Sequence, residues 1–230
     1  MLLVGYGKLA NMILALNQEQ KTFYIYNRTI EKVKQAESVD KRICYCDPAA
    51  FSECRSVFLA LPPEACISFL NEYESLFPAD CVFFHTATSL SADELKKAAP
   101  HHRIVPAKFA GHAIQAQRDN DSSKGTFVVP EMFDTEQKLL QQWLGPAFEV
   151  VNGTEDMVEA ANKMAVEETM KLIVALSDRL TEADVSTSVQ DAVLAQIPAG
   201  VVHAHLEGAH GAFAKQVLKH LETDKGDKKH

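Results

Sequence analysis

The sequence lacks an uninterrupted apolar run of the roughly 18 residues that a membrane-spanning helix needs. It also lacks an excess of positive charge, because the formal net charge is -8. This charge argues against a general binder of nucleic acid or anionic membranes. The apolar N-terminus has no preceding basic segment and no small-residue cleavage site. We therefore expect a cytoplasmic protein without a membrane partner or a nucleic-acid partner.

The sequence has few cysteines, and they show no disulfide framework. All five lie in the first 81 residues, and the odd count fits a reducing compartment. Cys44 and Cys46 point the same way on a strand but have no further ligand nearby, so we expect them to be structural. His203, His205 and His210 lack an acidic residue at helical spacing. We predict no metal site.

Short β-rich runs alternate with helical patterns over residues 1–152. The predicted strands are residues 1–4, 22–26, 43–46, 56–60 and 81–84, and the predicted helices are 8–17, 29–37, 64–77 and 91–98. Strands and helices at this spacing are typical of a doubly wound α/β domain with a mostly parallel sheet. Residues 104–106, 126–129 and 148–151 are expected to extend this sheet at its far edge.

The pattern becomes almost wholly helical after residue 152. Helices are predicted over residues 155–180, 187–206 and 211–221, with a kink or break at Pro198. We assign residues 153–223 to an all-helical C-terminal domain for dimerisation and substrate binding, and residues 224–230 to a disordered tail. The apolar positions of these helices suggest a homodimer.

A glycine motif follows the first predicted strand and opens the first predicted helix. It reads Gly5-Tyr6-Gly7-Lys8-Leu9-Ala10, a G-x-G-x-x-A pattern. The first glycine permits a tight turn, the second lets the backbone approach a pyrophosphate, and the alanine permits close packing of helix and strand. The helix end then attracts the anion. The motif predicts a Rossmann-type dinucleotide-binding domain over residues 1–152.

The end of the second predicted strand indicates which dinucleotide binds. A domain that prefers NAD carries Asp or Glu there, which binds the ribose 2′-hydroxyl. This sequence has Asn27, Arg28 and Thr29 instead, which can all donate hydrogen bonds to a 2′-phosphate. The predicted cofactor is therefore NADP.

Further contacts with the cofactor are expected at the ends of the fourth and fifth strands. Ligands of parallel α/β sheets bind beyond the carboxyl ends of the strands. Leu61 and Pro62 follow the fourth strand, and Thr86 follows the fifth. We predict that they contact the nicotinamide half.

Together these segments resemble pyrroline-5-carboxylate reductase and its 6-phosphogluconate-dehydrogenase-like relatives. The matching pieces are GYGKLA, the turn from Tyr26 to Thr29, VFLALPPEA and CVFFHTATSLSADEL. The resemblance covers roughly residues 1–130. It implies NADPH as hydride donor, a helical C-terminal domain, and a dimer whose active site uses helices of both subunits. Where the family has asparagine after proline, Ala107 and Lys108 follow Pro106.

Hydride transfer also needs a proton source. Lys108 follows a predicted strand end, and Lys163 lies where related hydroxyacid dehydrogenases have a catalytic lysine. His112 is a third candidate. For each of these residues, a solvated surface group is the simpler interpretation. We predict an NADP(H)-dependent oxidoreductase that acts on a small imine or oxo acid. The alternatives are a catalytically silent NADP-binding regulatory protein and a hydroxyacid dehydrogenase that uses Lys163.

Overall fold

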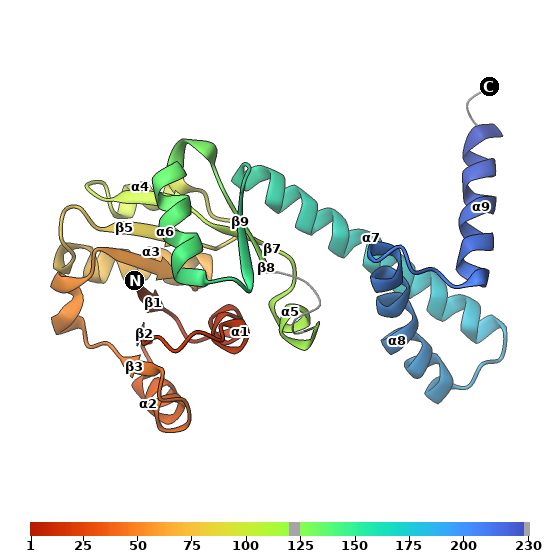
Figure 1. Cartoon of the computed structure of the whole chain (residues 1–230), viewed down its shortest axis with the longest axis horizontal. Helices are drawn as coiled ribbons and strands as arrows, with labels where there is room; N and C mark the ends of the chain where they lie inside the picture. The colour runs from red at the N-terminus through yellow and green to blue at the C-terminus, as the bar shows by residue number, and fades with distance from the viewer. Residues whose placement is uncertain (120–124, 228–230) are drawn as a thin grey trace. The chain divides into compact units, whose positions relative to one another are not determined.

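The computed structural model describes residues 1–119 and 125–227, with side chains through residue 221. Its main sheet has six parallel strands in the order β3-β2-β1-β4-β5-β6 (Figure 1). They are β1 (Leu2–Val4), β2 (Phe23–Tyr26), β3 (Ile43–Tyr45), β4 (Ser56–Leu59), β5 (Val82–His85) and β6 (Arg103–Pro106). The predicted fold class, a Rossmann-type parallel sheet with a helical region after it, is confirmed.

The helices between the strands begin where the sequence provides helix-start signals. They are α1 (Lys8–Leu16), α2 (Ile30–Val39), the 3-10 helix η1 (Pro48–Glu53), α3 (Pro63–Tyr73), the 3-10 helix η2 (Glu74–Leu76) and α4 (Ala92–Ala98). Asp47 caps η1 by accepting from the Ala49 N–H, and Ser91 and Glu94 form a capping box at α4. The predicted capping box is confirmed.

The sheet has a buried cluster on each face. On β4, Val57 and Leu59 pack in one cluster with Phe51 and Phe83, whereas Phe58 packs in the other. All three β4 side chains are fully buried. Alternate side chains of a strand point to opposite faces, so a strand covered on both sides needs a continuous apolar run. The SVFL sequence of β4 meets this requirement.

A second, three-stranded sheet was not expected. β7 (Lys108–Ala110) pairs antiparallel with β8 (Gly125–Val129), and β8 pairs parallel with β9 (Phe148–Asn152). The prediction that residues 126–129 and 148–151 extend the main sheet is therefore wrong, whereas residues 104–106 do lie at its edge.

Aromatic packing explains the position of this second sheet. Phe127 packs against Phe58 of β4, and also against Phe109 and Phe148 of its own sheet. These phenylalanines belong to one buried cluster. The second sheet therefore packs its apolar side chains on a face of the main sheet, where more of their surface is removed from water than at its edge. Helices α5 (Ala113–Asp119) and α6 (Asp134–Leu144), and the 3-10 helix η4 (Glu131–Phe133), were also not predicted.

The chain divides into two compact units, Met1–Met164 and Ala165–His230, and the division falls within α7 (Glu155–Glu182). The second unit contains the rest of α7, α8 (Thr187–Leu206) and α9 (Ala212–Asp227). Helix α8 runs through Pro198 without ending there. Helix α9 continues through Asp227, into the segment 224–230 for which a disordered tail is predicted. Residues 228–230 lie outside the described part.

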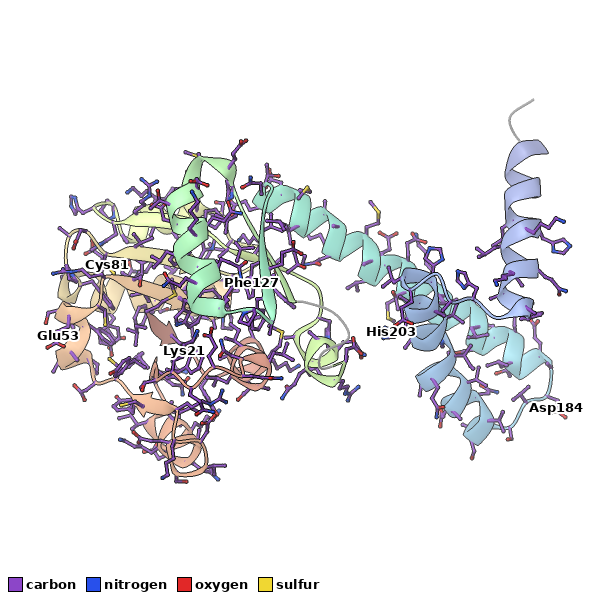
Figure 2. The ribbon with its side chains drawn as sticks, in the orientation of Figure 1. Lys21, Glu53, Cys81, Phe127, Asp184 and His203 are labelled. Carbon is purple, nitrogen blue, oxygen red and sulfur yellow. The ribbon has the colours of Figure 1, made fainter. Side chains whose placement is uncertain are left out.

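The second unit buries none of its described side chains. Figure 2 shows the side chains of α8 and α9 projecting away from the ribbon, whereas Phe127 lies inside the first unit. The exposed large apolar residues of the unit are Val166, Met170, Leu172, Ile173, Val174, Val189, Ile197, Val201, Val202, Leu206, Phe213, Val217 and Leu221. Among the described residues, no helix combines the length and the hydropathy that crossing a membrane requires.

Candidate functional site

The turn between β1 and α1 approaches the end of β4 closely at Gly5. Gly5 has a φ of +99°, a left-handed conformation that favours glycine. A Cβ atom there would lie 2.6 Å from the Ala60 carbonyl oxygen and 2.8 Å from Leu61 Cδ2. The Gly5 N–H donates to the Tyr26 carbonyl oxygen at 2.8 Å. The turn is therefore fixed against both strands that flank β1.

The amino end of α1 is open to a ligand. Gly7 precedes the helix, and no side chain of the described residues caps it. A Cβ atom on Gly7 would have no neighbour within 4 Å. Lys8 is exposed, Leu9 is partly buried, and Ala10 is fully buried in the core. The uncapped N–H groups and the helix dipole favour an anion at this end.

Asn27 links this turn to the turn after β2. Its Oδ1 accepts from the Tyr6 N–H at 3.2 Å, and its Nδ2 donates to the Thr29 carbonyl oxygen at 2.9 Å. The Asn27 amide therefore has protein partners at both ends. Arg28 is exposed, and its guanidinium has no hydrogen bond or ion pair with another residue in the described part of the chain. The Arg28 guanidinium is thus free to meet a ligand.

A pocket of about 520 Å³ opens beside these two turns. Its walls bring together several predicted cofactor residues, namely Gly5, Asn27, Arg28, Thr29, Leu61 and Pro62. The end of β2 provides no carboxylate, and Arg28 and Lys32 provide positive charge. Glu64 and Glu72 of α3 also line the pocket. Both charge signs are therefore present, with the cations on the β2–α2 segment and the carboxylates on α3.

The sequence interpretation missed Lys32 and the α3 residues of this pocket. Lys32 lies four residues after Arg28, in the first turn of α2. Its charge and its spacing from Arg28 could have identified it. Ser68, Phe69 and Tyr73 had no comparable signal, because only the packing of α3 brings them to the end of β2.

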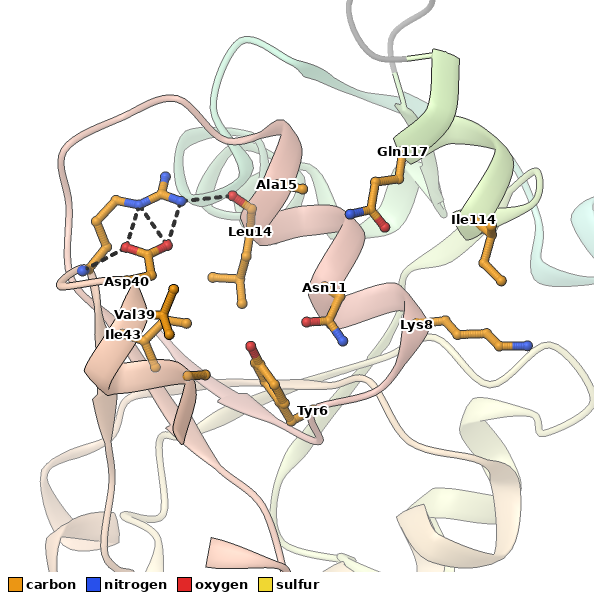
Figure 3. Close-up of a pocket in the computed structure, with 12 residues that line it drawn as sticks. Tyr6, Lys8, Asn11, Leu14, Ala15, Val39, Asp40, Ile43, Ile114 and Gln117 are labelled. Carbon is orange, nitrogen blue, oxygen red and sulfur yellow. Dashed lines mark hydrogen bonds and ion pairs between the residues drawn. The ribbon is translucent and has the colours of Figure 1, made fainter. Parts of the chain in front are cut away.

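Tyr6 faces a second pocket, of about 490 Å³, lined by residues of α1, α2 and α5. Figure 3 shows its ring pointing into this pocket, beside Leu14 of α1 and Val39 of α2. Burial, with the nearby charge of Asp40, raises the Tyr6 pKa. The Asp40 carboxylate is already paired with Arg42 at 2.7 Å. The Tyr6 ring therefore points into a pocket distinct from the one beside Arg28.

The ends of β4 and β5 are tied together by Thr86. Its hydroxyl donates to the Leu59 carbonyl oxygen at 2.9 Å, and the residue is only 8% exposed. The turn at Leu61 and Pro62 follows β4. Leu61 is partly buried and Pro62 is exposed. The Thr86 hydroxyl is therefore committed to the protein backbone, next to the predicted position of the nicotinamide.

A buried ionisable cluster lies beyond the ends of β5 and β6. The Lys108 ammonium is 1% exposed and lies 3.3 Å from Glu155 Oε2, which is also 3.7 Å from His85 Nε2. Burial lowers the pKa of Lys108, and burial with the nearby Lys108 charge lowers the pKa of His85 to about 3. Burial also raises the pKa of the Cys66 thiol to about 12. The His85 ring and the Cys66 thiol are therefore neutral, and they lie near the ion pair of Lys108 and Glu155.

Lys163 and His112 are in more open environments. Lys163 is exposed on α7 and pairs with Glu159, one helical turn earlier. The His112 ring is exposed, and its Nδ1 accepts from the Gln115 N–H. Asn162 donates to the Phe109 carbonyl oxygen at 3.0 Å, which fixes this part of α7 to β7. Of the predicted proton donors, only Lys108 is enclosed by the protein.

Several solved structures with the same fold are reductases or dehydrogenases. The chain aligns with a pyrroline-5-carboxylate reductase from Coxiella burnetii at 17% identity and TM-score 0.69, covering 99% of this chain and 91% of that one. A pyrroline carboxylate reductase from Plasmodium falciparum with NADP bound aligns at 14% identity and TM-score 0.62, covering 99% and 90%. A 3-hydroxyisobutyrate dehydrogenase from Mycobacterium tuberculosis aligns at 17% identity and TM-score 0.56, covering 84% and 68%.

Comparison with protein-family models gives no match, and neither does comparison with curated proteins. At these identities, the structural similarity establishes the fold over nearly the whole chain. The resemblance inferred from the sequence is confirmed at this level, as a fold shared with pyrroline-5-carboxylate reductases.

Acidification is expected to destabilise the fold through His85. Its pKa falls from 6.5 in the unfolded chain to about 3 in the folded protein. The unfolded chain therefore binds a proton below pH 6.5 that the folded protein does not accept. The contribution is complete above pH 6.5 and is lost at about 1.4 kcal/mol per pH unit as the pH falls toward 3. Urea unfolding at about pH 7 and about pH 4.5 measures this loss.

A His85→Leu variant should lose less stability than the wild type between these pH values. Leucine costs little here, because neither ring nitrogen of His85 has a hydrogen-bond partner among the described residues. His112→Leu is the matched control, since His112 is exposed and should leave the pH dependence unchanged. An unchanged pH dependence in His85→Leu would contradict the buried, neutral state of His85.

Proposed function

We propose that this chain is an NADP(H)-dependent oxidoreductase that transfers hydride to a small imine or oxo acid. The observation that carries the proposal is the pairing of an open helix end with a free guanidinium. The uncapped start of α1 suits a pyrophosphate, and Arg28 beside the pocket suits a 2′-phosphate. The similar structure from Plasmodium falciparum, which is described with NADP bound, supports this choice of cofactor.

Each predicted cofactor residue has a role in this proposal. The residues from Gly5 to Ala10 form the pyrophosphate turn, in which Tyr6 contributes its backbone. Arg28 and Thr29 meet the 2′-phosphate, with Lys32 as a further cation, and Asn27 holds the two turns together. Leu61, Pro62 and Thr86 border the nicotinamide half. Bound NADPH would supply the hydride, and the protein would bind and orient both reactants.

The proposal predicts a preference for NADPH that depends on Arg28. Arg28→Ala should weaken NADPH binding by about 10- to 100-fold, the range for a lost charge-assisted hydrogen bond, and leave NADH binding unchanged. Isothermal titration calorimetry measures both affinities. Arg55→Ala is the matched control, because Arg55 is an exposed arginine at the amino end of β4. A wild-type protein that ignores NADPH, or prefers NADH, would remove the basis of the proposal.

A second function, NADP binding without turnover, has its own support. Lys108 is enclosed and Lys163 is paired with Glu159, so neither of the two predicted catalytic lysines is free. A panel of cyclic imines and 2- and 3-oxo acids, assayed by loss of NADPH absorbance, separates the two functions. For the oxidoreductase we expect turnover of at least one compound. Binding without any turnover favours a regulatory protein.

The same panel tests the hydroxyacid dehydrogenase alternative. If Lys163 donates the proton, Lys163→Ala should lower kcat by about 100-fold or more, the typical contribution of a general acid. Lys171→Ala is the control, because Lys171 is a similarly exposed lysine that also pairs with glutamates on α7. Full activity in Lys163→Ala would exclude this alternative.

We also propose that the protein is a homodimer joined through its helical unit. Helices without a buried apolar face gain little stability from packing. None of the described side chains of this unit is buried within the single chain, although many are large and apolar. A second copy of the unit would supply a matching apolar surface.

Light scattering is expected to give twice the chain mass of 25.4 kDa. Val174→Asp should shift the mass to that of the monomer, because a charge in an apolar interface is costly. Val39→Asp, which changes a still more exposed valine on α2, is the matched control and should remain dimeric. A monomeric wild-type protein would contradict the dimer.

A further inference from the structure

We propose that Lys108 is a positioning residue that holds the loop from Thr86 to Leu90 from its buried side. Glu155 then connects this loop to α4 and α7. The inference rests on the proposed function, since this loop follows β5 at the predicted nicotinamide end. It gives Lys108 a role different from that of proton donor.

The ammonium can donate three hydrogen bonds, and two carbonyl oxygens and one carboxylate lie around it. Lys108 donates to the carbonyl oxygens of Ala87 and Leu90, the latter at 2.6 Å, and lies 3.3 Å from Glu155 Oε2. The side chain is 1% exposed. Delivery of a proton to a substrate would therefore require breaking a contact that holds the loop.

The two carbonyl contacts also set the direction of the loop. In a trans peptide the C=O and N–H groups point in opposite directions. Because the Ala87 carbonyl points inward to Lys108, the Thr88 N–H points away from it. The side chains of Thr88 and Ser89 are exposed, whereas Ala87 and Leu90 are buried. Lys108 thus determines which groups of the loop face outward.

The loop is fastened at its other side as well. The Thr86 hydroxyl donates to the Leu59 carbonyl oxygen at 2.9 Å, next to the turn at Leu61 and Pro62. A change in the loop would therefore be transmitted to the end of β4. Both segments are predicted to border the nicotinamide, and Leu61 and Pro62 also line the pocket at Arg28, whereas the loop from Thr86 to Leu90 does not.

Glu155 extends the connection to two helices. Its Oε1 accepts from the Ala92 N–H at the start of α4, at 3.2 Å, and its Oε2 is next to Lys108. Glu155 is itself in the first turn of α7. A buried ion pair usually contributes less to stability than an apolar pair of similar volume would. The polar contacts are better explained by the geometry that they impose on loop and helices.

Two nucleotides separate positioning from general stability. NADPH has the nicotinamide half, whereas adenosine 2′,5′-bisphosphate has only the adenine half with its 2′-phosphate. Lys108→Met should weaken NADPH binding by about tenfold and leave the bisphosphate affinity unchanged, as calorimetry measures them. Lys138→Met, which changes an exposed lysine of the same compact unit, is the control for both ligands.

The double variant Lys108→Met, Glu155→Gln tests whether weaker NADPH binding results only from a loss of stability. It removes the unpaired carboxylate that Lys108→Met leaves behind, so its melting temperature should exceed that of the single variant. Its NADPH affinity should nevertheless stay about tenfold low, because the loop is still unfastened. Recovery of NADPH affinity together with stability, or equal weakening for both nucleotides, would overturn the positioning role.

Hydrogen–deuterium exchange on the wild-type protein tests whether the loop is held, without any substitution. The Leu90 N–H, which donates to the Ala87 carbonyl oxygen within the loop, should be protected before any nucleotide is added, and free exchange there would overturn the proposal. A wild-type protein that binds neither nucleotide would refute the proposed function. This exchange measurement would still decide whether the loop is held.

Discussion

The close approach of the β1–α1 turn to the end of β4 is the constraint on which the rest of the site depends. A side chain at Gly5 would collide with the Ala60 carbonyl group, and its φ of +99° disfavours other residues. This contact brings the start of α1 to the carboxyl edge of the sheet. The turns after β2 and β4 then lie on either side of it and form the walls of the pocket.

Two cations near this edge have opposite environments. Arg28 is exposed and has no partner among the described residues, whereas Lys108 is enclosed, donates to two carbonyl oxygens and is paired with Glu155. An uncommitted guanidinium keeps its hydrogen-bonding capacity for a ligand. The Lys108 ammonium instead donates its hydrogen bonds to protein carbonyl oxygens, so it contributes to the shape of the site. We therefore propose two different roles for residues of equal formal charge, ligand recognition for Arg28 and loop support for Lys108.

Local patterns predicted the main sheet and the glycine turn, because apolar runs such as SVFL and the G-x-G-x-x-A motif determine structure over a few residues. The second sheet was not predictable in this way, since Lys108–Ala110 pairs with a segment about 18 residues later through aromatic packing. The burial of Lys108 depends on carbonyl groups of another loop, which leave no trace in the sequence around it. For the same reason the α3 side of the pocket was missed.

The double use of the Asn27 amide has an evolutionary consequence. An aspartate at this position could still accept from the Tyr6 N–H, but its second oxygen would face the Thr29 carbonyl oxygen and repel it. The carboxylate typical of NAD-preferring domains therefore cannot be acquired here by one substitution without weakening the turn. Under the proposed function, a drift in nucleotide preference would require a compensating change nearby.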